Sequence, residues 1–165
     1  MFADYSEVDP LFPPRRLVHA QVLVRDEKGD IFLSTDNPRD DCAWELPTWR
    51  ARRNEPPHDA ARLAAGQDVS LNLDTLTLLV VDSTTAEPDR TEGLWFVFYG
   101  GTLTGTQLGK AGIPAANDDI DNLMLAAPDD LRDLCAESHE RIRAALDRIT
   151  NPYAPVYLTN GQPPL

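Results

Sequence analysis

The chain has 165 residues and carries 15 Lys and Arg against 27 Asp and Glu, which gives a formal net charge of −12. This length suits a single domain, and 42% hydrophobic with 25% charged residues is the balance of a globular protein. The negative charge argues against non-specific nucleic-acid binding and against docking on anionic lipid, because both need basic surfaces.

Cysteine content and hydropathy predict the compartment. Cys42 and Cys135 are too few for a disulfide framework. Residues 1–7 are acidic and lack the apolar core of a secretory signal. The longest apolar run, over residues 76–81, is far too short to span a membrane. We therefore expect a cytoplasmic protein with neither a membrane nor a nucleic acid as partner.

The first third of the chain predicts a hairpin after an extended segment. Three prolines make residues 1–14 an extended arm. Apolar residues largely alternate over 15–25, which predicts a strand. Residues 26–30 contain Gly29 and predict a turn, after which residues 31–34 return as the partner strand.

The middle of the chain predicts one helix and two strands. Residues 48–54 form an arginine-rich loop. The two prolines that follow are tolerated only in a first helical turn, so we expect a helix over 56–68. Strands are predicted at 76–82 and 94–103, and the small residues of 104–117 predict a loop.

The last part predicts a strand, a helix and a tail. Residues 120–125 fit a strand, and a helix is expected from about 128–131 until just before Pro152. The tail, 151–165, holds four prolines and is expected on the surface. The element order predicts one α/β domain over 15–150, with a mixed sheet flanked by two helices.

Two segments resemble the Nudix hydrolase family. AWELP at 43–47 is similar to the family's WELPGG strand end, and EPPHDAA at 55–61 is similar to its GE-(T/S)-P-x-x-A-A helix start. Residues 119–131 resemble its late acidic stretch, and YLTNG at 157–161 resembles the ending of many actinobacterial members. The resemblance implies a Nudix-like α/β/α sandwich, in which the box helix and a C-terminal helix flank a mixed β-sheet.

The family's box, G-x5-E-x7-R-E-U-x-E-E-x-G-U, is degenerate in this chain. Its helix glutamates share one face and hold Mg²⁺. Carried over, the opening glycine becomes Trp49, Glu55 matches the first glutamate, the next becomes Ala64, and the last pair becomes Gln67 and Asp68. One helix carboxylate binds Mg²⁺ weakly. We therefore expect no metal site and no cofactor, with Mg²⁺ only if the chain is a weak hydrolase.

The loop after the WELP segment is the strongest candidate for ligand binding. Arg50, Arg52 and Arg53 can hold a carboxylate or phosphate by bidentate hydrogen bonds, and Trp49 can close the pocket or stack on a planar ligand. The alternative is a solvated loop whose arginines pair with surface acids. Gln67 and His19 complete the predicted ligand contacts; a partly buried structural histidine is the alternative for the latter.

Four titratable residues are candidate acid–base groups: Asp68, His58, Glu92 and Glu55. For His58 and Glu92 the alternative is an ordinary surface position. A further acidic cluster resembles a metal site, but solvated turn acids at a strand start are the favoured explanation: Asp118, Asp119 and Asp121.

These patterns favour a repurposed, metal-independent enzyme that acts on a small organic acid or acyl intermediate, as in specialised metabolism. A non-catalytic ligand-binding or regulatory module is the first alternative, and a weak Mg²⁺-dependent nucleoside-diphosphate hydrolase is the second. The expected partner is a small anionic molecule, and a homodimer is left open.

Overall fold

The computed structural model describes residues 16–35, 44–88, 90–110, 122–131, 134, 136–154 and 156–164, without the side chains of 68, 69, 122 and 136. Several predictions lie outside the described residues: the arm 1–14, both cysteines, and the acidic cluster at 118–121.

Seven strands form one mixed sheet in the order β6-β2-β1-β5-β4-β7, with β3 paired to β1. The β1–β5 and β4–β7 pairs are parallel, and the other strand pairs are antiparallel. The strands are β1 Leu17–Asp26, β2 Ile31–Thr35, β3 Thr48–Arg50, β4 Thr77–Thr84, β5 Gly93–Leu103, β6 Asn122–Ala126 and β7 Tyr157–Thr159, and the helices are α1 Pro57–Val69, α2 Gly105–Leu108 and α3 Ala136–Thr150.

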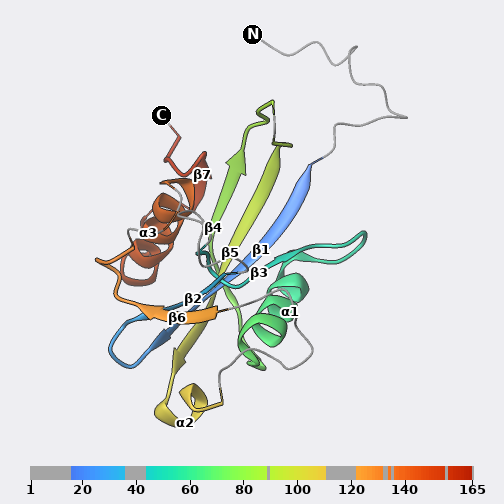
Figure 1. Ribbon diagram of the computed structural model, residues 1–165. Coiled ribbons are helices and arrows are strands. Elements are labelled where there is room, and N and C mark those ends of the chain that lie inside the picture. Colours follow the sequence, from blue (N-terminus) through green and yellow to red (C-terminus); the bar gives the residue numbers. More distant parts are fainter. Residues whose placement is uncertain are drawn as a thin grey trace, which may run out of the picture.

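The predicted α/β/α sandwich is confirmed, with α1 and α3 on opposite faces of the sheet (Figure 1). Side chains of β1 alternate between the two faces, as the pleat requires. Val22 and Val24 join the core beneath α1, whereas Leu23 joins the core beneath α3 together with Ile142. Both faces of β1 are therefore buried.

Helix α1 lies close to the sheet because its buried face is made of alanines. Pro57 at its first position has no N–H to leave unsatisfied, and Ser70 ends the helix in the left-handed conformation at φ 54°. The small side chains allow a near approach to β1 and are fully buried: Ala60, Ala61, Ala64 and Ala65.

Two of the predicted loops contain regular structure. Residues 48–50 are strand β3, because Trp49 pairs with Ala20 of β1 in an antiparallel register. Residues 105–108 are the short helix α2, whose start is closed by a capping box between Thr104 and Gln107. A three-residue strand and a four-residue helix are too short to produce a periodic hydropathy pattern.

The C-terminal prediction is wrong in two respects. Helix α3 begins at Ala136 rather than near 128–131, and Leu131 is buried outside it. The tail is not confined to the surface, since Leu158 of β7 is fully buried and β7 is parallel to β4. Its alternation of one buried residue between two exposed ones is the signature of a very short edge strand.

Candidate functional site

The arginine-rich loop lines a hollow of about 400 Å³ beside the start of α1. We call this the basic hollow. Its walls carry four arginines and one glutamate, and its floor is apolar. The lining residues are Arg16, Leu17, Val18, Arg50, Ala51, Arg52, Arg53, Glu55, Pro57, Leu94 and Phe96.

Short-range hydrogen bonds hold the loop in shape. The backbone N–H of Ala51 donates to the carbonyl of Val18 at 2.8 Å, which anchors the loop to β1. Asn54 adopts the left-handed conformation at φ 64° and turns the chain back. The Glu55 carboxylate then accepts from the backbone N–H of Arg52 at 2.8 Å, while the N–H of Glu55 donates to the carbonyl of Arg52 at 3.1 Å. The turn thus presents its arginines around the hollow.

The positive charge of the basic hollow is only partly compensated. Arg16 pairs with Glu92 at 3.1 Å, and the guanidinium of Arg52 lies 5.2 Å from the ring centroid of Trp49. Among the described residues, Arg50 and Arg53 have no carboxylate partner. The positive end of α1 also begins at the hollow, at Pro57. Together these features create a positive potential in a strongly acidic protein.

Trp49 does not line the basic hollow. Its side chain packs against the two core clusters under α1, and Arg52 covers its ring. The indole Nε1 is buried and has no hydrogen-bond partner in the part of the chain that the structure describes. Trp49 therefore supports the wall of the hollow from behind, and the ligand-stacking role predicted for it has no geometric support.

The helix positions that carry metal ligands in the box hold one alanine, one glutamine and one aspartate in this chain. Ala64 is fully buried, and Gln67 is exposed. Asp68 belongs to the helix, but its side chain is outside the description. Within the described residues, no group of three His, Cys, Asp or Glu side chains could hold a metal ion.

His58 lies on α1 but outside the hollow. It is half-exposed, and its Nε2 is 3.3 Å from the Asp59 carboxylate, which also pairs with Arg62 at 3.0 Å. Glu92 does not line the hollow, but its carboxylate pairs with Arg16, which does. Of the four acid–base candidates, Glu55 is the one whose side chain lies in the described lining of the hollow.

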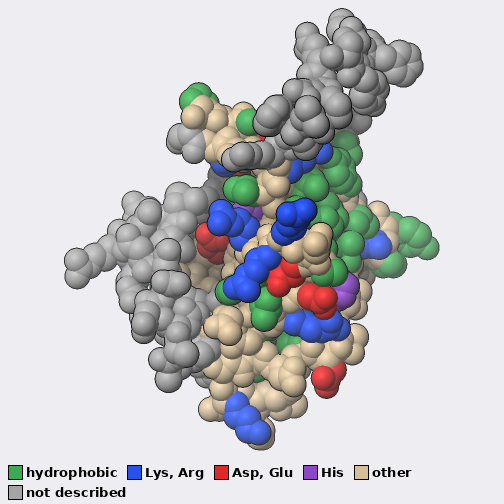
Figure 2. Space-filling model, turned by 90° about the vertical axis from the view of Figure 1, so that its right-hand side faces the viewer, with side chains coloured by type: hydrophobic (Ala, Val, Ile, Leu, Met, Phe, Trp, Pro, Cys, Tyr) green, Lys and Arg blue, Asp and Glu red, His purple; other side chains and the backbone are tan. Residues whose placement is uncertain are grey.

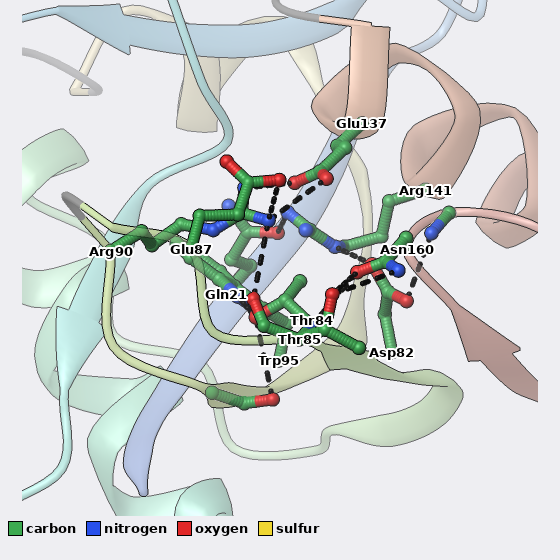
Figure 3. A network of polar contacts seen from close by, with 12 residues as sticks. Gln21, Asp82, Thr84, Thr85, Glu87, Arg90, Trp95, Glu137, Arg141 and Asn160 are labelled. Atoms are coloured by element: carbon green, nitrogen blue, oxygen red, sulfur yellow. Dashed lines mark hydrogen bonds and ion pairs between the residues drawn. The ribbon is translucent and has the colours of Figure 1, made fainter.

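A buried polar network occupies the opposite face of the sheet, under α3 (Figure 3). The guanidinium of Arg141 pairs with Asp82 at 3.0 Å, and the two side chains are 2% and 0% exposed. Asp82 also accepts from the backbone N–H of Gly161 at 3.0 Å. Arg141 lies 4.3 Å from the ring centroid of Trp95 and 3.5 Å from the Gln21 amide oxygen.

His19 belongs to this buried network and not to the basic hollow. Its ring stacks on Trp95 with centroids 4.0 Å apart and planes 10° from parallel. Burial, together with the charges of Arg141 and Arg50, lowers the pKa of His19 to about 4. His19 is thus a neutral ring at neutral pH, stacked on Trp95 and outside the lining of the hollow.

Solved structures identify the architecture. No protein-family profile and no curated protein matches the chain. A MutT Nudix hydrolase from Burkholderia pseudomallei superimposes with a TM-score of 0.63 at 21% identity, covering 82% of this chain and 98% of that one. The chain has a Nudix fold.

Other Nudix structures agree. The Nudix domain of Shewanella oneidensis NrtR, solved with ADP-ribose, gives a TM-score of 0.64 at 13% identity and covers 90% of this chain and 99% of that one. The E. coli ORF135 protein gives 0.65 at 12% identity, covering 85% and 96%. At these identities the likeness shows the Nudix fold and leaves the chemistry to this chain's own residues. Within the described residues, no helix is both long and apolar enough to cross a membrane.

The sequence patterns gave no prediction for Arg141 and Asp82, the ion pair at the centre of the buried network. Arg141 precedes Ala145 by four residues and Ile149 by eight, so it falls within the apolar stripe of α3. An arginine in such a stripe indicates a buried partner. Nothing in the sequence indicates that this partner is Asp82, which is 59 residues away.

Proposed function

We propose that this Nudix fold binds a small anionic organic molecule in the basic hollow, and that it does so without a divalent metal on α1. The observation that carries the proposal is Arg53, which lines the hollow beside its apolar floor and has no carboxylate partner among the described residues. A carboxylate or phosphate supplies the missing partner through charge-assisted, bidentate hydrogen bonds.

Charge distribution supports an anionic ligand. A protein of net charge −12 has many carboxylates for its arginines, and Arg16, Arg62, Arg90 and Arg141 all pair with one. If the loop were only a solvated surface loop, its arginines would also be expected to pair with nearby carboxylates. Arg50 and Arg53 depart from this expectation, which favours a binding role.

Metal independence is supported by the composition of α1. Ala64 replaces a box glutamate and is buried against the sheet, so it offers no oxygen to a cation. Asp68 alone retains a carboxylate at the helix positions of the box. The NrtR Nudix domain is a relevant precedent for an anionic ligand, since it was solved with ADP-ribose.

Chemical conversion of the bound molecule is the second candidate, and Glu55 favours it. Its carboxylate lines the hollow and is positioned by the N–H of Arg52 at 2.8 Å. In that role Glu55 would transfer a proton to or from an organic acid or acyl compound held by the arginines. Binding is the more direct conclusion, because the other described acid–base candidates lie outside the hollow.

Isothermal titration with succinate, citrate and inorganic phosphate tests the proposal. We expect Arg53→Ser to weaken binding by roughly 10- to 100-fold, the effect of losing a charged hydrogen bond. Arg50→Ser should have a smaller effect, because Arg50 pairs with His19 and its side chain lies on the other face of the sheet. Arg62→Ser is the matched control, since Arg62 lies on the exposed side of α1 and pairs with Asp59. Equal affinity in all four proteins, or no binding by the wild type, would overturn the proposal.

A further inference from the structure

The floor of the basic hollow continues into an apolar strip across the sheet. Phe96 of β5 pairs with Val81 of β4, and Val81 pairs with Tyr157 of β7. Residues directly opposite each other in neighbouring strands share a face, and Phe96 packs with Ala20 on the face of α1. Leu94 lies two residues before Phe96 and therefore on the same face. We call Leu94, Phe96, Val81 and Tyr157 the apolar strip.

Helix α1 leaves this strip partly uncovered. The helix packs mainly on β1 and β3, whereas the strip lies on β5, β4 and β7. Leu94, Phe96 and Val81 are only partly buried, and Tyr157 is 48% exposed. Figure 2 shows hydrophobic side chains on the surface next to a group of basic ones on the side of the molecule that carries α1.

The hollow and the strip are continuous. Leu94 and Phe96 belong to both, because they line the basic hollow and begin the strip. Ser83 and Thr159, which pair in the next row of the sheet, form a polar boundary along one side. A ligand seated at the arginines therefore meets an apolar track that polar side chains border on this side.

We propose that the basic hollow and the apolar strip form one site for an anionic amphiphile. Its carboxylate or phosphate head lies at Arg53, and its unbranched apolar tail crosses Phe96 and Val81 to reach Tyr157. This inference rests on the proposed function and adds the class of ligand. Small polar acids would fill the hollow but leave the apolar side chains of the strip exposed to water. They would therefore gain no binding free energy from burying those side chains.

The dimensions set the length of the tail. Neighbouring strands are about 4.8 Å apart, so the track from Phe96 to Tyr157 spans about 10 Å. Each methylene buried along it is expected to raise affinity by up to about fourfold. The gain should stop once the tail passes Tyr157, because β7 is the edge of the sheet.

The test is a chain-length series by isothermal titration below the micelle concentration, with butyrate, hexanoate, octanoate, decanoate and dodecanoate. We expect affinity to rise steadily from butyrate and then level off. Val81→Thr and Tyr157→Ser should flatten the rise while leaving butyrate affinity unchanged. Tyr153→Ser is the control, because Tyr153 is 94% exposed and outside the strip. Arg53→Ser should weaken every member by the same factor.

The failures are distinguishable. Butyrate binding with no gain along the series would refute the amphiphile and leave the proposed function intact. Absence of binding at every length would refute both. Equal affinity for octanoate and octylamine would refute the anionic head. A dimer in light scattering that Tyr157→Ser dissociates and octanoate does not would show that a second copy of the chain covers the strip instead.

Discussion

The guanidinium Nε of Arg141 lies 3.0 Å from the carboxylate Oδ2 of Asp82, and the two side chains are almost completely buried between α3 and the sheet. Burial lowers the pKa of Arg141, and the Asp82 carboxylate opposes that effect. Since the carboxylate also accepts from the N–H of Gly161, this one pair joins α3, β4 and the turn after β7.

Removal of the arginine should be strongly destabilising. In Arg141→Met the Asp82 charge stays buried without its partner, and we expect the free energy of unfolding to fall by about 3–5 kcal/mol. Urea denaturation monitored by circular dichroism measures this. Arg143→Met is the control, because Arg143 is 63% exposed and its nearest carboxylate is 3.9 Å away. A loss below 1 kcal/mol in Arg141→Met would show that the pair is not essential to the fold.

His19 should make stability depend on pH. The pKa of His19 is about 4 in the folded state and near 6.5 in the unfolded chain, so the unfolded state takes up the proton first as pH falls. The contribution is complete above pH 6.5 and is lost between 6.5 and about 4. Solvent screening of the half-buried ring limits the loss to about 2 kcal/mol.

Replacement of the imidazole isolates this effect. His19→Phe keeps a ring against Trp95 and removes the proton site, so unfolding curves at pH 7 and pH 4.5 should differ less than in the wild type. His58→Gln serves as the control, since it removes an imidazole that is 53% exposed and lies outside the buried network. An unchanged pH dependence in His19→Phe would contradict the assignment.

Glu55 has two opposing effects on an anion in the basic hollow. Its charge repels the ligand, but its carboxylate also accepts the Arg52 N–H that shapes the loop. Glu55→Gln keeps an acceptor and removes the charge, so we expect severalfold tighter binding of succinate. Glu55→Ala removes both and should bind more weakly than Glu55→Gln. If Glu55 also transfers protons, a turnover assay should not follow this order of affinities. Glu55→Gln would then bind succinate tightly but be inactive.

Divalent metal should not contribute to ligand binding. With Ala64 and Gln67 where the box has glutamates, we expect neither 5 mM Mg²⁺ nor a chelator to change the melting temperature or the affinity for succinate, within about twofold. Asp68→Asn should behave like the wild type in this experiment. A Mg²⁺-dependent stabilisation that Asp68→Asn abolishes would instead support the weak-hydrolase alternative.

Much of the fold could be predicted from the sequence because its longest elements have clear patterns. The alternation over β1, the aromatic run of β5 and the prolines before α1 place these elements within one or two residues. Strand β7 was missed because three residues cannot show a period, and proline-rich surroundings favour a loop. The start of α3 was misplaced because Pro128 and two acids make an equally good helix start.

The candidate site was predictable only in part. The cluster of arginines at 50–53 is local, and its position after the WELP segment was sufficient to indicate a pocket wall. The sequence pattern does not indicate which distant strands pair. Arg16 and Leu94 both line the hollow because β1 pairs in parallel with β5. The same pleat sends His19 to the other face, where it meets Trp95 rather than a ligand.

Mapping where octanoate binds decides whether the basic hollow holds an anion. An amide chemical-shift titration of the isotope-labelled protein with octanoate should perturb residues 50–55, Leu94 and Phe96 first, followed by Val81 and Tyr157. Arg53→Ser should suppress these changes. Saturable shifts confined to the α3 face around Trp95 and Arg141, with the loop unaffected, would contradict the account.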